Sequence, residues 1–217
     1  RGTQIGLEAL APKVEIVPLR ADDKPLGDDI AAAYQDRKVR IFNLSLHFED
    51  LLVTHVRRRL REFPQALSVV SAGNDPTDGQ AICETDRPYP AYPVCEGWRN
   101  NVLVVAGTNL AGDALIEPVG SNPGSNWNER VVSVAAPGFG FYAPGRNGGY
   151  QLVDGTSFAA PLVTATAALL FAQGISDPWL IKQRIIATAD LREGLRKRVQ
   201  GAGLLNMARA VTEPMRS

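Results

Sequence analysis

The sequence lacks a charge imbalance and a long apolar run. Its 23 Lys and Arg residues balance 23 Asp and Glu residues, so no net field favours binding to nucleic acid or to an anionic membrane. The longest apolar stretches, such as Phe158–Ala172, fall short of the roughly 20 residues that cross a bilayer, and this one contains Pro161. We therefore expect neither a nucleic-acid partner nor a membrane span.

Cysteine and histidine are also scarce, with two residues of each. Cys83 and Cys95 flank a loop rich in Pro and Tyr, which fits one loop-closing disulfide in a secreted or otherwise extracytoplasmic protein, or two reduced surface thiols. Their spacing and the lack of a second ligand pair argue against zinc. Asp75 and Asp78 are too few to define a calcium site, so we expect no cofactor and leave structural calcium open.

Phosphate-binding loops are missing as well. Gly138-Phe139-Gly140 is a lone G-x-G without a third glycine in register, and no G-x-x-x-x-G-K-[ST] string occurs. We therefore reject a nucleotide-binding function, which the fold pattern alone would allow.

The residues that are present suffice for one hydrophobic core. With 217 residues and 45% hydrophobic content, we expect a single domain over residues 1–217. Short runs rich in Val and Ile alternate with helical patterns, which predicts a three-layer α/β/α fold with a mainly parallel sheet. The expected strands are Val14–Leu19, Val39–Leu46, Leu67–Ser71, Val102–Ala106 and Val131–Ala135.

Two helices are expected between these strands. Asp28–Arg37 begins with acidic and ends with basic residues, as the helix dipole favours. Asp50–Glu62 has apolar residues at helical spacing, with four arginines between Arg57 and Arg61 mostly outside that stripe. We interpret the arginine run as a solvated helix face rather than an anion site, and His55 as a packed or half-exposed residue of the same helix.

The chemistry concentrates in DGTSFAAPLVTATAA, residues 154–168. Gly155 and Thr156 predict a tight turn, Ser157 stands at a helix entrance, and small residues continue the helix to about Phe171. A serine there exposes its hydroxyl near the positive end of a helix, where developing negative charge is stabilised. The alternative is that Ser157 is only an N-cap.

A second polar position follows a predicted strand in VVSAGND, residues 69–75. Taken by itself, Asn74 is interpreted as a turn former, which Gly-Asn-Asp favours.

The string G-T-S-F-A-A-P-L-V resembles the nucleophile signature of subtilisin-like serine peptidases, with Pro161 one turn into the helix. The chain is similar to the C-terminal two-thirds or so of that catalytic domain. The resemblance implies a serine endopeptidase in which Ser157 is the nucleophile. It also implies that Asn74 and the Ser157 backbone N–H form the oxyanion hole.

Further segments fall in the order of the family. IFNLSL, residues 41–46, resembles the strand that lines the substrate cleft, so Ser45 and Leu46 are expected to bind an extended peptide and His47 to narrow a subsite. Ala72 and Gly73 are expected on another side of that pocket. Residues 101–107, 125–126 and 135–138, with the closing GAGLLN of residues 201–206, extend the resemblance from about Ala11 to Val211.

The chain departs from the family at the general base. Subtilases use Asp, His and Ser in that chain order, and neither His47 nor His55 lies in a His-Gly-Thr motif. Arg1-Gly2-Thr3 resembles that motif with Arg1 in the base position, where a guanidinium cannot accept a proton. The N-terminus shows neither an initiating Met nor a signal peptide, so we expect a processed or truncated chain.

Two readings remain open. In the first, the chain is part of an active endopeptidase whose Asp and His come from a preceding segment, and a propeptide or that segment is a partner beside the peptide substrate. In the second, it is a degenerate subtilase that binds peptides or proteins without cutting them. Retention of both Ser157 and Asn74 favours the first reading, because a binding module needs neither.

Overall fold

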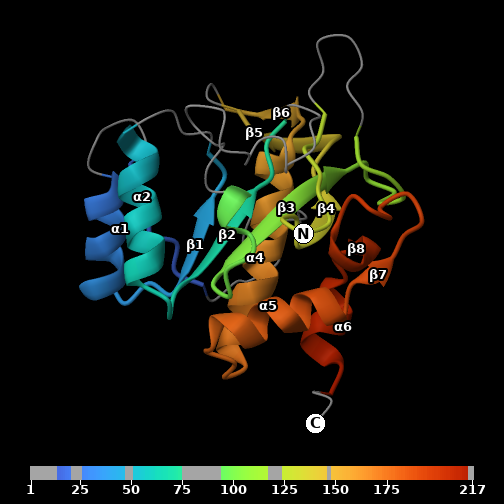
Figure 1. The fold of residues 1–217 in the computed structure, drawn as a ribbon. Helices are drawn as coiled ribbons and strands as arrows, with labels where there is room; N and C mark the ends of the chain where they lie inside the picture. Colours follow the sequence, from blue (N-terminus) through green and yellow to red (C-terminus); the bar gives the residue numbers. More distant parts are fainter. Residues whose placement is uncertain are drawn as a thin grey trace, which may run out of the picture.

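The computed structural model describes residues 14–20, 26–46, 51–74, 94–116, 124–145 and 148–214, without the side chains of residues 51–54 and 94. Six strands form one sheet in the order β1-β2-β3-β4-β8-β7, in which only β7 pairs antiparallel (Figure 1). The strands are β1 (Ile41–Leu44), β2 (Leu67–Ser71), β3 (Val102–Thr108), β4 (Val134–Pro137), β7 (Asp190–Leu191) and β8 (Gly203–Leu204). The mainly parallel sheet confirms the predicted fold class.

Helices cover both faces of this sheet. They are α1 (Leu26–Gln35), α2 (Leu51–Glu62), α4 (Thr156–Ala172), α5 (Pro178–Ala187) and α6 (Met207–Thr212), with the 3-10 turns η2 (Val94–Glu96) and η3 (Gln200–Ala202). The remaining strands, β5 (Phe141–Pro144) and β6 (Tyr150–Val153), form a separate antiparallel hairpin. None of the helices in the described ranges is long and apolar enough to cross a membrane.

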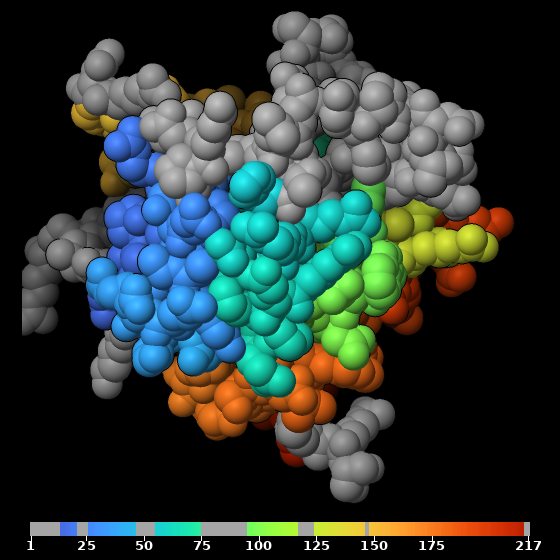
Figure 2. Space-filling model, turned by 60° about the vertical axis from the view of Figure 1, so that its left-hand side comes forward, coloured from blue at the N-terminus to red at the C-terminus, as the bar shows by residue number. Residues whose placement is uncertain are grey.

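The core lies in two layers, one on each side of the sheet. Leu26 and Ile30 of α1 and Val56 of α2 pack with β1 side chains on one face, where α1 and α2 lie side by side (Figure 2). Ala160 and Val163 of α4 pack against the other face together with α5. Every residue of β2 and β3 is buried, as expected for Val-rich strands covered on both sides.

α5 carries a buried lysine. Lys182 is 6% exposed, and its ammonium donates three hydrogen bonds of 2.6 to 2.9 Å to backbone carbonyls, those of Gly97, Arg99 and Val102. Burial lowers the pKa of Lys182 from 10.5 to about 8. The lysine therefore ties α5 to the start of β3.

The arginine run of α2 is not simply a solvated face, and this interpretation is wrong in part. Nε of Arg57 and Nη2 of Arg61 donate to Oε1 of Glu96 at 2.8 and 3.2 Å, and Glu96 is only 1% exposed. Nη1 of Arg99 lies 3.5 Å from the other carboxylate oxygen of Glu96. A carboxylate taken out of water needs such partners, so the arginines fix η2 against α2.

The predicted strand at Val14–Leu19 is the main difference from the expected fold. Residues 14–20 belong to no strand, although their composition favours one. A strand needs a neighbour for its backbone groups, and the nearest sheet edge, β1, is separated from this segment by a cavity. Among the residues that the structure describes, the predicted element therefore has the right composition but no pairing partner.

Candidate active site

Ser157 is the second residue of α4, at the carboxyl edge of the parallel sheet. The N-cap of the helix is Gly155, so the alternative in which Ser157 is merely an N-cap does not hold. Gly155 has φ 143°, a conformation that side-chain-bearing residues rarely adopt, and a Cβ there would come within 3.2 Å of Nδ2 of Asn74. No hydrogen bond joins the Ser157 hydroxyl to another residue of the described ranges.

Asn74 lies beside this helix start and is held by its side-chain oxygen. The backbone N–H and the hydroxyl of Thr156 both donate to Oδ1 of Asn74, each at 2.9 Å. Because the oxygen end of the amide is fixed in this way, the orientation of the planar group is fixed and Nδ2 lies against Gly155. The Asn74 donor and the first turn of α4 are thus adjacent.

The turn that carries Asn74 is itself supported from two sides. Nδ2 of Asn126 donates to the carbonyl of Ala72 at 2.9 Å, and the N–H of Asn126 donates to the carbonyl of Gly73 at 3.0 Å. The N–H of Gly73 donates to the Thr156 hydroxyl at 3.2 Å. Ala72 is fully buried, so of the two residues expected at the substrate pocket only Gly73 has any exposure.

Ser45 contacts the backbone of Ser157 directly. Its hydroxyl donates to the Ser157 carbonyl at 3.0 Å. In a regular helix that carbonyl would accept from the N–H four residues later, but this residue is Pro161, which has none. Ser45 thus supplies the hydrogen bond that Pro161 cannot.

The Ser45 hydroxyl also accepts a hydrogen bond from the edge strand β1. Nδ2 of Asn43 donates to Oγ of Ser45 at 2.9 Å, and Oγ1 of Thr164 donates to Oδ1 of Asn43 at 2.9 Å. Asn43 lies on β1 and Thr164 on α4, so this chain of bonds links the edge strand to the helix that carries Ser157. Leu46, the other expected substrate residue of this segment, is half-buried.

The described residues contain no imidazole at this site. His55 is exposed on α2, its backbone and Cβ lying against Gly27 of α1, on the face of the sheet opposite to α4. His47 and Arg1 lie outside the described residues. The general base therefore has no candidate among the residues that the structure describes.

Of the cysteines and aspartates considered for a disulfide or a metal site, Cys95 is the one that lies within the described residues. Cys95 is disulfide-bonded, and Cys83, the only other cysteine of the sequence, lies outside the described residues. Asp75 and Asp78 also lie outside them. Within the described ranges, His, Cys, Asp and Glu form no group of three that could hold a metal ion.

Sequence reasoning missed two residues that shape the site. Thr156 was treated as part of a tight turn, and Asn126 only as part of a family segment, yet their hydrogen bonds fix Asn74 and the turn before it. Thr156 adjoins Ser157 in the motif, which was a signal for its role. Asn126 is far from both motifs in sequence, so no spacing rule could place it.

A three-layer α/β fold with a serine at a helix start and a side-chain amide beside it is compatible with a serine hydrolase. The chain belongs to the Subtilase family, whose sequence model matches residues 2–203. The match confirms the resemblance carried by the sequence motifs and supports a serine protease-type function.

Individual relatives agree with this assignment. A "Probable subtilase-type serine protease" of Deinococcus radiodurans is 30% identical over 135 residues, which cover 52% of this chain and 18% of that protein. The A-subunit of the AB5 toxin from E. coli superposes with a TM-score of 0.66 at 19% identity, over 91% of this chain and 69% of that one. The prenylagaramide maturation protease PagA gives 0.61 at 23% identity, over 91% and 69%.

Proposed function

We propose that this chain carries the nucleophile and the oxyanion-stabilising groups of a serine endopeptidase. Ser157 attacks the scissile carbonyl carbon, and a bond forms between its Oγ and that carbon. The amine side of the peptide leaves with a proton, and water then hydrolyses the acyl-enzyme. The substrate lies extended along residues 45–47 with Gly73 on another side of its pocket.

The observation that carries this proposal is the pair of bonds from Thr156 to Oδ1 of Asn74. A side-chain amide fixed by its oxygen keeps its N–H donors in one direction before any substrate arrives. Such preorganised donors are what stabilises a developing oxyanion, because no reorganisation is needed during the reaction. The Ser157 N–H, in the first turn of α4 where helix amides have no helical partner, is the second donor.

The Ser157 proton needs an acceptor, and we place that acceptor outside the described residues. The family order of Asp, His and Ser puts both partners before Ser157 in the chain. The degenerate alternative, a peptide-binding protein without this base, remains the second candidate because the one described histidine lies on the opposite face of the sheet.

Labelling with a fluorophosphonate, which reacts only with an activated serine, tests the proposal. The 217-residue chain and a form extended N-terminally by its native residues are compared, each with Ser157→Ala and with the exposed Ser176→Ala as matched control. We expect the extended form to label, Ser176→Ala to label equally, and Ser157→Ala not to label.

Turnover of a peptide by the labelling form then tests the oxyanion donor. Asn74→Ala should lower kcat by about 10²- to 10³-fold, the size known for such a donor in a member of this family. If the extended protein is folded but does not label, the endopeptidase function is rejected and the peptide-binding function remains.

A further inference from the structure

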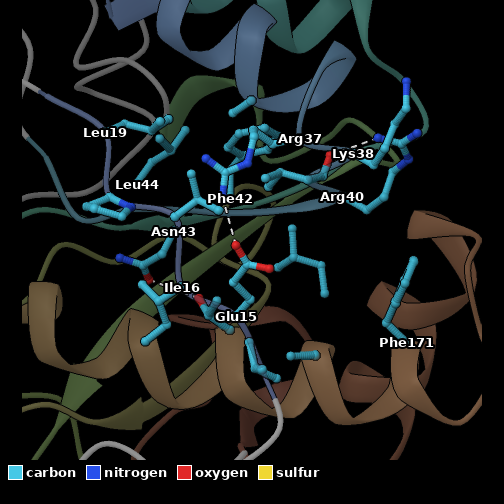
Figure 3. Close-up of a pocket in the computed structure, with 18 of the residues that line it drawn as sticks. Glu15, Ile16, Leu19, Arg37, Lys38, Arg40, Phe42, Asn43, Leu44 and Phe171 are labelled. Atoms are coloured by element: carbon cyan, nitrogen blue, oxygen red, sulfur yellow. Dashed lines mark hydrogen bonds and ion pairs between the residues drawn. The ribbon is translucent and has the colours of Figure 1, made fainter.

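The Ser157 carbonyl lies at the end of a row of three polar side chains, those of Thr164, Asn43 and Ser45. The Ser45 hydroxyl donates to this carbonyl at 3.0 Å, and Nδ2 of Asn43 donates to Oγ of Ser45 at 2.9 Å. The side chain of Asn43 points from β1 toward α4 (Figure 3). There Oγ1 of Thr164 donates to Oδ1 of Asn43 at 2.9 Å. Neither Asn43 nor Thr164 has a role in the proposed chemistry.

Each hydroxyl of this row has one proton, so it donates one hydrogen bond at a time. Ser45 accepts from the Asn43 amide and therefore keeps its proton for the Ser157 carbonyl. Thr164 has two acceptors within reach, Oδ1 of Asn43 at 2.9 Å and the carbonyl of Ala160 at 3.0 Å. The acceptor that Thr164 uses is therefore linked to the direction of the whole row.

The amide of Asn43 fits the row in two orientations, because its oxygen and nitrogen differ little in size. In the observed orientation it accepts from Thr164 and donates to Ser45. In the reversed orientation its oxygen would accept the Ser45 proton and its nitrogen would donate to Thr164. Thr164 would then donate to the Ala160 carbonyl. Only the observed orientation gives the Ser157 carbonyl a donor.

The two carbonyls at the ends of the row differ in their need for a hydroxyl. The Ser157 carbonyl has no helical donor, because the residue four positions later is Pro161. The Ala160 carbonyl, in contrast, has the N–H of Thr164 four residues later in α4. A backbone carbonyl without a partner is costly, so the Ser157 carbonyl favours the observed direction.

We infer that Asn43 and Thr164 are positioning residues for Ser157, and that they act through the direction of this row of hydrogen bonds. The Thr164 proton holds the Asn43 amide in the orientation that leaves the Ser45 proton to the Ser157 carbonyl. This bond fixes the first turn of α4, and with it the Ser157 hydroxyl, before a substrate binds. The inference rests on the proposed function, because the position of Ser157 affects a rate only if Ser157 reacts.

Two substitutions of Asn43 separate the direction of the row from simple contact. In Asn43→Asp the carboxylate only accepts, so it takes the Ser45 proton away from the Ser157 carbonyl. In Asn43→Ala that proton stays available. The rate constant for fluorophosphonate labelling of the extended form should therefore fall about fivefold with Asp but no more than about twofold with Ala. In peptide turnover, the Asp variant should lower kcat and leave KM little changed.

The Ser45→Ala background separates the row from the new charge of Asn43→Asp. A negative charge near Ser157 would also slow labelling, because it repels the developing oxyanion. Without the Ser45 hydroxyl the row no longer reaches the Ser157 carbonyl. In this background Asn43→Asp and Asn43→Ala should therefore label at the same rate, whereas an effect of charge through space would persist.

Substitution of Thr164 tests the other end of the row. Thr164→Val keeps the shape and removes the proton, so the Asn43 amide takes both orientations and labelling should slow about twofold. Thr164→Ser should retain the rate. The matched control is Thr212→Val on α6, whose hydroxyl likewise donates to the carbonyl four residues earlier, that of Ala208 at 2.8 Å. This control should label like the unsubstituted protein.

Equal labelling rates for the two Asn43 variants, or an Asp effect that persists with Ser45→Ala, would overturn the inference and leave the proposed function intact. Chemical denaturation of the extended form supplies a readout that needs no reaction. Asn43→Asp should lower the denaturation midpoint more than Asn43→Ala, and Ser45→Ala should abolish this difference. If the unsubstituted extended form does not label, the proposed function fails, and the midpoints alone decide whether the row has the inferred direction.

Discussion

The hydroxyl of Ser45 donates to the carbonyl of Ser157 at 3.0 Å, in place of the helical bond that Pro161 cannot make. The first turn of α4 is therefore held from outside the helix, by β1. A backbone carbonyl that loses its helical partner needs another when it is taken from water. The position of Ser157 thus depends on the strand as well as on its own helix.

This relationship predicts that substitutions of Ser45 and Pro161 have non-additive effects on the free energy of unfolding. Ser45→Ala should lower the free energy of unfolding by about 1 kcal/mol, because the Ser157 carbonyl loses its donor. In a Pro161→Ala background the helix regains an N–H for that carbonyl, so the same change should cost distinctly less. Chemical denaturation of the four proteins gives the coupling energy. Equal costs in both backgrounds would mean that the two bonds do not replace each other.

Thr156 is expected to act as a positioning residue for Asn74. Thr156→Val removes the hydroxyl and leaves only the backbone N–H to orient the amide, so kcat of the labelling form should fall about tenfold with KM little changed. Thr156→Ser keeps the hydroxyl and should retain most of the rate. A Val variant that raises KM and leaves kcat intact would contradict this role.

From the lowered pKa of Lys182 we predict that the free energy of unfolding rises in alkaline solution. Its pKa is about 8 in the folded protein and 10.5 for the free side chain, so the unfolded chain binds more protons between these values. The free energy of unfolding should therefore increase as the pH rises from about 8 to 10.5, by up to about 3 kcal/mol. The three carbonyl acceptors stabilise the ammonium and make this an upper value.

The Lys182→Met variant separates the effect of Lys182 on stability from that of other groups that titrate in the same pH range. In Lys182→Met the pH-dependent rise should be absent, while the remaining groups contribute as before. Denaturation midpoints of both proteins at several pH values between 7 and 11 decide the point. Parallel curves for the two proteins would show that Lys182 titrates as it does in water.

We expect loss of the buried Glu96 charge to lower the free energy of unfolding far more than loss of the exposed Glu193 charge. Glu96→Gln removes the buried charge that Arg57 and Arg61 share, and should cost about 2 kcal/mol. The control is Glu193→Gln, which breaks an ion pair with Arg196 whose side chains are 82% and 70% exposed, and should cost less than about 0.5 kcal/mol. Thermal unfolding compares the two variants. Similar small decreases in Tm would contradict the larger contribution that we assign to the buried Glu96 carboxylate.

Much of the sheet followed from the sequence. Leu67–Ser71 was predicted with the bounds of β2, and the predicted start of β3 at Val102 is the observed one. These strands are buried on both faces, so a continuous apolar run is a strong signal. Helix α4 was also expected, because small residues follow the turn at Gly155. The hairpin of β5 and β6, whose exposed Tyr142, Tyr150 and Leu152 carry no core pattern, was missed.

The candidate site was predictable in its principal residues but not in their support. Ser157 and Asn74 each stand in a string with a recognisable order, whereas the bonds of Thr156 and Ser45 depend on how loops far apart in the chain meet. The expected strand at residues 14–19 failed for a different reason. Strand formation is a property of a pair, and composition reports only one member.

Two bonds of unlike chemistry meet at η2. Cys95 is disulfide-bonded, and its neighbour Glu96 accepts hydrogen bonds from Arg57 and Arg61 of α2. A reductant cleaves the first and leaves the second. The ion pairs of Glu96 with Arg57 and Arg61 therefore keep η2 attached to α2 in a reducing solution, where the disulfide no longer contributes.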